Sequence, residues 1–231
     1  MDRYQGSFRN PADPGALGGL VITLFALALA TVFSQLAVLA TGGDGWIRIT
    51  ATGPTPGAFM VLALCSAAGF LTVSGLLLFL FRGRIGLAVR RSHVAPAAAA
   101  LAAILLANLA GTSLGGWLGE DYAGAQDLGS GGPAVIGVFL VAVLLAPAVE
   151  ELFFREVLLV RVLAGAPRVL AISVTAISFG LFHMTAGGIV LVATLTFMGM
   201  ALAWLRLRTG SLATPFLVHA LNNAIALLFL S

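Results

Sequence analysis

Long apolar runs without charge constrain this chain more than any other feature. The first run, Leu17 to Ala40, extends for 24 residues without a charged side chain. A helix of about 20 apolar residues crosses the hydrocarbon core of a bilayer. Because several such runs follow one another, the sequence predicts an all-α, polytopic membrane protein.

Composition supports the same class of protein. Hydrophobic residues make up 60% of the 231 residues and charged residues 9%, whereas soluble domains average roughly 25% charged residues. The 12 basic residues are all arginine, so a Schiff-base or Ser-Lys mechanism has no candidate lysine. No internal repeat or second unit is visible, and we expect residues 1–231 to form one membrane domain.

Gly- and Pro-rich stretches divide the chain into seven expected membrane helices. The fourth is longer than a bilayer requires, so its second half, with Arg155, Glu156 and Arg161, is expected to project into water. Gly187-Gly188 marks a break, and a re-entrant segment there would change the count and the side on which Ser231 lies. The expected helices are Leu17–Ala40, Gly57–Phe81, Ala95–Leu118, Ala134–Ala164, Val169–Ala186, Ile189–Leu205 and Ser211–Leu230.

The arginine-rich loops predict how the chain is oriented. The loop from Arg82 to Arg91 contains four arginines and no acid, and the turn at Arg206–Gly210 contains two more. Cytoplasmic loops of membrane proteins carry this excess of basic residues. We therefore expect an integral protein of the bacterial plasma membrane with a cytoplasmic N-terminus. The net charge of +3 reflects this orientation and not nucleic-acid binding.

A charged motif follows the uncharged run Ala134–Ala148. Glu150, Glu151 and Arg155 lie close to membrane depth, where ionisable groups are costly and usually functional. Glu151 and Arg155 are four residues apart and suit an ion pair on one helix face. Glu150 lacks that partner and suits a general base. Pro147 removes a backbone N–H, which frees a carbonyl one turn earlier. The alternative interpretation is a helix end that meets water.

Polar residues of two later helices are expected to meet Glu150. His183 follows the turn near Ala166 by about as many residues as Glu150 precedes it, so an antiparallel hairpin brings the two to one level. His219 and Asn223 are four residues apart and share a helix face. A single histidine in an apolar helix usually packs against a backbone carbonyl, but this group of four at similar depth indicates a site.

Three motifs in this order and spacing resemble those of the CPBP family, which includes CAAX prenyl endopeptidases and bacteriocin-processing and immunity proteins. The resemblance covers residues 134–231, which would form the catalytic core. The motifs are Glu150-Glu151-x-x-x-Arg155, Phe179-x-x-x-His183 and His219-x-x-x-Asn223.

The resemblance implies an intramembrane endopeptidase that acts on a peptide or protein entering from the membrane or the cytoplasm. It implies that Glu150 and His183 hold and deprotonate a water molecule, and that His219 and Asn223 donate to the oxyanion. Glu151, Arg155 and Phe179 would shape the site and position the substrate. The resemblance does not identify the substrate or require that it be prenylated.

Alternatives remain open at this point. We expect no cofactor, but Glu150, His183 and His219 could together bind one zinc ion. The polar cluster could also bind a partner without cleaving it, as in a membrane immunity or scaffold protein. It could serve as a relay in a proton-coupled transporter, although the N-terminal half does not repeat the polar positions as an inverted-repeat transporter would.

Overall fold

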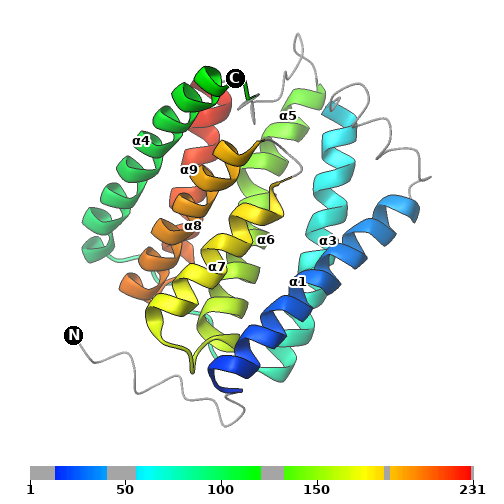
Figure 1. The fold of residues 1–231 in the computed structure, drawn as a ribbon, viewed down its shortest axis with the longest axis vertical. Coiled ribbons are helices and arrows are strands. Elements are labelled where there is room, and N and C mark those ends of the chain that lie inside the picture. The colour runs from blue at the N-terminus through cyan, green and yellow to red at the C-terminus, as the bar shows by residue number, and fades with distance from the viewer. Residues whose placement is uncertain (1–13, 41–55, 121–132, 185–187, 230–231) are drawn as a thin grey trace.

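The computed structural model describes residues 14–40, 56–120, 133–184 and 188–229. In these ranges the chain forms seven helices and no β-strand (Figure 1). The prediction of an all-α membrane protein is confirmed. The helices are α1 (Gly15–Ala40), α3 (Pro56–Leu80), α4 (Val94–Leu118), a continuous fourth helix, α7 (Arg168–Phe182), α8 (Ile189–Thr209) and α9 (Ala213–Phe229).

The helices have the lengths that a membrane protein requires. Within the described ranges, five are long and apolar enough to cross a membrane, and α7 and α9 are shorter apolar helices. The expected fifth helix was to reach Ala186, but α7 ends at Phe182. The next amide, that of His183, bonds to the Gly180 carbonyl at 3.0 Å and begins a tight turn. The proposed break at Gly187 lies outside the described residues.

The fourth helix changes its hydrogen-bond register along its length. It consists of α5 (Pro133–Leu140), the π-helical η2 (Val141–Leu145), α6 (Ala146–Glu150) and the π-helical η3 (Glu151–Val162). π-Helical segments are rare and occur frequently at functional sites. The first π-helical segment ends five residues before Glu150, and the second contains Glu151 and Arg155 of the predicted charged motif.

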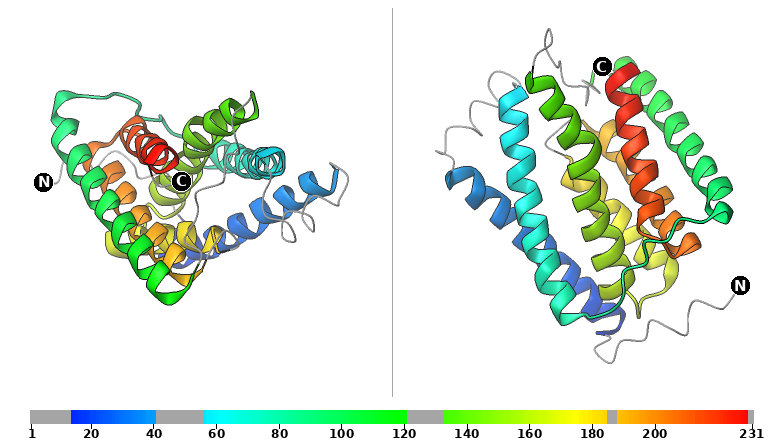
Figure 2. Two further views of the ribbon diagram at one scale, coloured as in Figure 1. Left: turned by 90° about the horizontal axis from the view of Figure 1, so that it is seen from above. Right: turned by 180° about the vertical axis from the view of Figure 1, so that it is seen from behind.

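Helix η3 lies at the centre of the bundle. Phe153, Phe154, Val157 and Leu158 are fully buried, at 0% exposure, and a helix that is buried on all sides must be covered by neighbours all round. Figures 1 and 2 show α4 at one side and α1 at the other, with the fourth helix between them. The expectation that the second half of this helix projects into water is therefore wrong.

Small residues allow the outer helices to approach closely. A Cβ atom on Gly69 of α3 would lie 2.6 Å from the Ala30 carbonyl oxygen of α1, and one on Gly180 of α7 would lie 2.6 Å from the Val192 carbonyl oxygen of α8. Glycine at such positions is typical of helix packing in membranes, where backbones must come close for good van der Waals contact. These contacts hold α1 against α3 and α7 against α8, around the central helix.

Candidate active site

Glu150 lies between two histidine rings. Its Oε1 atom is 3.8 Å from Nε2 of His183, which directly follows α7. Its Oε2 atom is 3.7 Å from Nε2 of His219 on α9. Only 14% of the Glu150 side chain is exposed. The structure thus brings together three residues that sequence spacing had placed at a similar depth.

The hydrogen bonds of the two histidines fix how their rings face Glu150. Nδ1 of His183 lies 2.9 Å from the Phe179 carbonyl oxygen, and Nδ1 of His219 lies 3.0 Å from Oε1 of Glu151. A carbonyl or carboxylate oxygen accepts, so each Nδ1–H donates. Both rings therefore direct Nε2 toward Glu150, and Glu151 orients the ring of His219.

Arg155 and Phe179 form the wall behind this group. Nε of Arg155 lies 3.3 Å from Oε2 of Glu151, which forms the predicted ion pair. The guanidinium carbon lies 4.6 Å from the centre of the Phe179 ring, a cation–π distance. The Phe179 ring also contacts His183 and His219, with centroid distances of 4.9 and 5.8 Å. These contacts hold both histidine rings in place.

Asn223 donates a hydrogen bond to a backbone carbonyl that has no backbone donor, because residue 147 is proline. In η2 the Ala146 amide bonds five residues back, to the Val141 carbonyl. The next amide would bond to the Ala142 carbonyl in this register, but residue 147 is proline and has no N–H. Nδ2 of Asn223 donates to that carbonyl at 2.9 Å. Because an amide has two N–H donors, this bond orients Asn223 and leaves its second donor available.

A chain of amides continues from Asn223 toward α4. Nδ2 of Asn222 donates to Oδ1 of Asn223 at 3.4 Å, and Nδ2 of Asn108 donates to Oδ1 of Asn222 at 2.9 Å. Sequence reasoning did not single out Asn108. The sequence does contain a signal for it, since Asn108 is the single amide side chain in the expected third helix. Amide side chains within membranes usually form hydrogen bonds between helices.

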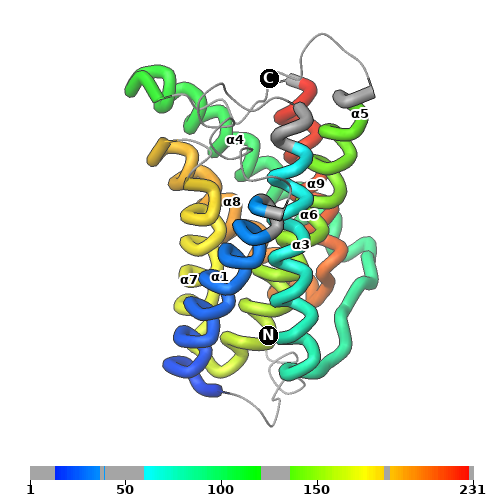
Figure 3. The backbone as a smooth tube through the Cα atoms, turned by 90° about the vertical axis from the view of Figure 1, so that its right-hand side faces the viewer, coloured from blue at the N-terminus to red at the C-terminus, as the bar shows by residue number. Residues whose placement is uncertain are grey.

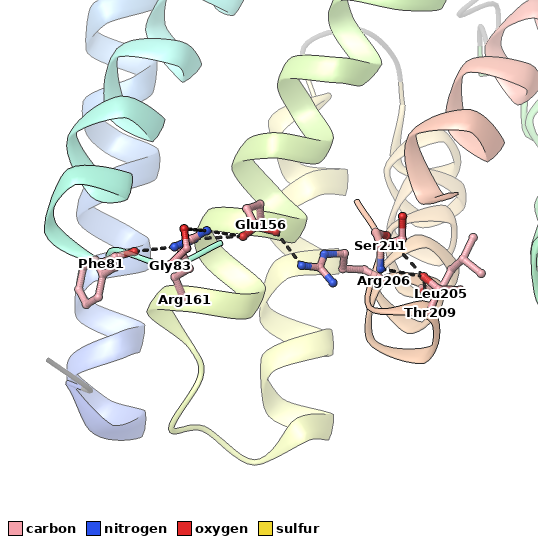
Figure 4. Close-up of polar contacts among 8 residues, drawn as sticks. All are labelled: Phe81, Gly83, Glu156, Arg161, Leu205, Arg206, Thr209 and Ser211. Carbon is pink, nitrogen blue, oxygen red and sulfur yellow. Dashed lines mark hydrogen bonds and ion pairs between the residues drawn. The ribbon is translucent and has the colours of Figure 1, made fainter. Parts of the chain in front are cut away.

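A second buried polar cluster lies beyond the site on the same helix (Figure 4). Oε1 of Glu156 lies 2.6 Å from Nη2 of Arg161, and Oε2 lies 2.7 Å from Nη2 of Arg206 on α8. Exposure is 0% for Glu156, 8% for Arg161 and 2% for Arg206. These residues, like Arg155, were expected in water. They can be buried because each charge has a charged partner inside the bundle, and Arg155 also lies against the face of the Phe179 ring.

The metal alternative concerns the same three side chains, Glu150, His183 and His219. Within the described ranges, no three His, Cys, Asp or Glu side chains form a group that could hold a metal ion. The zinc alternative for Glu150, His183 and His219 stays a prediction, and no catalytic step is derived through zinc.

Comparison with protein families gives a match, which lies in the C-terminal part of the chain. Comparison with curated proteins and with solved structures gives no match. Residues 132–225 match the family model described as type II CAAX prenyl endopeptidase, Rce1-like. This segment contains all three motifs and every residue placed around Glu150. The resemblance that the motifs indicated is thus confirmed for this part of the chain: residues 132–225 match the Rce1-like model of the CAAX protease family.

Proposed function

We propose that the protein is an intramembrane endopeptidase in which Glu150 is the general base. The observation that carries this proposal is the position of the Glu150 carboxylate between two Nε2 atoms, at 3.8 and 3.7 Å. Both separations are too long for direct hydrogen bonds. Polar groups at such a separation are often bridged by water, and a water between a carboxylate and an imidazole is the nucleophile that peptide hydrolysis requires.

The reaction begins with proton transfer from that water. Glu150 accepts the proton, and the water oxygen attacks the carbonyl carbon of the scissile peptide bond. His183 holds the water through Nε2, because its Nδ1–H is committed to the Phe179 carbonyl. As the tetrahedral intermediate collapses, Glu150 returns the proton to the leaving amine nitrogen. The bond between carbon and nitrogen breaks, and a carboxylate and an amine are released.

His219 and Asn223 are proposed to stabilise the oxyanion. The second N–H of the Asn223 amide is an oxyanion donor that does not titrate. His219 can donate through Nε2 when its ring is protonated, and Glu151 balances that charge through the 3.0 Å bond to Nδ1. Preorganised donors of this kind are usually the largest single source of rate enhancement. Glu151 and Arg155 position these groups and do not touch the reacting atoms.

The proposed substrate is a peptide segment that reaches the bundle interior from the membrane or from the cytoplasmic side. The matching family model is described as type II CAAX prenyl endopeptidase, Rce1-like. A prenylated segment is one such membrane-associated substrate, and other peptides presented at the bilayer are chemically equivalent at the scissile bond.

Comparative proteomics of membranes tests the function without knowing the substrate. New N-termini present with the wild-type protein should disappear with Glu150→Gln and with His183→Ala. Glu120→Gln is the matched control: Glu120 accepts a bond from the Val190 amide at 3.0 Å, and glutamine retains an acceptor oxygen. Identical sets of N-termini in the wild type and in Glu150→Gln would refute an enzymatic role and favour binding without cleavage.

A further inference from the structure

The segment that joins α3 to α4 has properties that the proposed reaction does not use. Residues 82–90, here called the strap, have no regular secondary structure and are mostly exposed. They run along the outside of the bundle end (Figures 2 and 3). Ile85, Leu87 and Val89 occupy alternate positions, with exposures of 37%, 62% and 55%. Alternate residues of an extended chain point to one side, so the strap presents an aliphatic edge.

The strap is held in place by bonds along its length. Arg161, anchored by the buried Glu156, donates to the Phe81 carbonyl at 2.8 Å and to the Gly83 carbonyl at 3.3 Å (Figure 4). The Leu212 amide, before α9, donates to the Gly86 carbonyl at 2.7 Å. Just beyond the strap, Nδ1 of His93 lies 3.1 Å from the Thr214 hydroxyl. The aliphatic edge is therefore presented in a defined position.

Positive charge surrounds this edge. The exposed arginines at this end of the bundle are Arg82, Arg84, Arg90, Arg91, Arg168 and Arg208. Of the acidic residues in the described ranges, Glu156 lies nearest to this end, and it is buried and bound by two other arginines. Nothing acidic in the described part of the chain offsets the exposed charge.

We propose that the strap, together with Arg91, is a binding site for anionic phospholipid. It connects the ends of two helices that are long enough to cross a membrane, which places it at the boundary between headgroups and acyl chains. There Ile85, Leu87 and Val89 can enter the acyl boundary, and long arginine side chains can reach the phosphates. Basic residues at a membrane surface attract anionic lipids in this way.

The combination of charge and aliphatic surface favours lipid over the other anions. A free phosphate group would be attracted by the arginines but would gain nothing from the exposed aliphatic side chains. A phospholipid offers a partner for both. The proposal goes beyond the proteolytic function and does not depend on it, because binding can be measured with an inactive protein.

Lipid titration of the full-length protein tests the proposal. Phosphatidylglycerol or phosphatidylcholine is added to the purified protein in neutral detergent at about 0.15 M salt, where charges more than about 8 Å apart are largely screened. Lipid occupancy is followed by native mass spectrometry. The variant Arg84→Gln/Arg90→Gln/Arg91→Gln should bind phosphatidylglycerol on the order of a hundredfold more weakly, because each basic residue contributes roughly fivefold. The control Arg168→Gln, at the start of α7, should stay within about threefold of wild type.

Two further arms identify the ligand. Leu87→Ser should weaken phosphatidylglycerol binding several-fold, and soluble glycerol phosphate should compete weakly or not at all. Equal occupancy by the two lipids in the wild type would overturn the proposal. So would equal losses in the strap variant and in the control, which would indicate diffuse attraction to the whole end of the bundle. Complete displacement by glycerol phosphate would reassign the site to free phosphate. If the strap variant does not fold, the proposal is decided by the lipid preference of the wild type and by the binding of phosphatidylglycerol to Leu87→Ser.

Discussion

Replacing Glu156 by glutamine should destabilise the protein strongly although the residue does no chemistry. The carboxylate is the charged partner of both Arg161 and Arg206. Arg206 is 2% exposed, and without Glu156 its buried charge loses its partner. Removing one partner of a buried ion pair costs roughly 3–5 kcal/mol.

The expected loss lies near the lower end of that range. Glutamine keeps one acceptor oxygen, and Arg161 keeps its bonds to the Phe81 and Gly83 carbonyls. We therefore expect Glu156→Gln to lower the free energy of unfolding by about 3 kcal/mol. For a chain of this length, that loss corresponds to a decrease in Tm of roughly 6–12 °C.

Thermal unfolding in detergent measures this effect. Glu120→Gln, at the opposite end of the bundle, serves as the control and should change stability by less than about 0.5 kcal/mol. The double variant Glu156→Gln/Arg206→Gln should recover part of the loss, because the unpaired charge of Arg206 is removed with its partner. A loss below about 1 kcal/mol in Glu156→Gln, or a double variant less stable than either single variant, would refute this explanation.

Three other predictions follow from the site and from the strap. Asn223→Ala should lower kcat by roughly 10² to 10³, the usual effect of losing one oxyanion donor. An unchanged kcat would contradict the oxyanion role and leave Asn223 with a structural role only, through its bond to the Ala142 carbonyl. Gly86→Ala should cost about 1–3 kcal/mol because its Cβ would press on the Gly210 carbonyl oxygen, whereas Gly75→Ala in open space should cost nothing; equal Tm values would contradict this packing. A chelator should leave activity unchanged, and activity lost to the chelator and restored by zinc would assign a metal mechanism instead.

Much of the fold could be predicted from the sequence, and so could the approach of Glu150 to His183, because both depend on residue spacing. Uncharged runs gave the helices, since the bilayer sets their length. The separation of Glu150 and His183 from the turn between them placed both at one level, and the structure puts their side chains 3.8 Å apart. The four-residue spacing of Glu151 and Arg155 likewise corresponds to their 3.3 Å contact.

The burial of the other charges could not be predicted because it depends on partners from distant parts of the chain. Glu156 pairs with Arg206, fifty residues later, and no local pattern distinguishes this pair from charges at a solvated helix end. The π-helical register of η2 and η3 also escaped prediction. Pro147 indicated that a carbonyl is freed, but only the register of η2 identifies it as that of Ala142, and only the tertiary fold supplies Asn223 as its donor.

The central claim is that Glu150 takes the proton from the attacking water, and turnover of purified variants in proteoliposomes tests it most directly. The substrate is a peptide whose new N-terminus is found in the membrane comparison. Glu150→Gln should fold like wild type and lower kcat by a factor of 10² to 10⁴, the range for loss of a general base, while Glu120→Gln should retain full kcat. A Glu150→Gln protein with kcat within threefold of wild type would contradict the account.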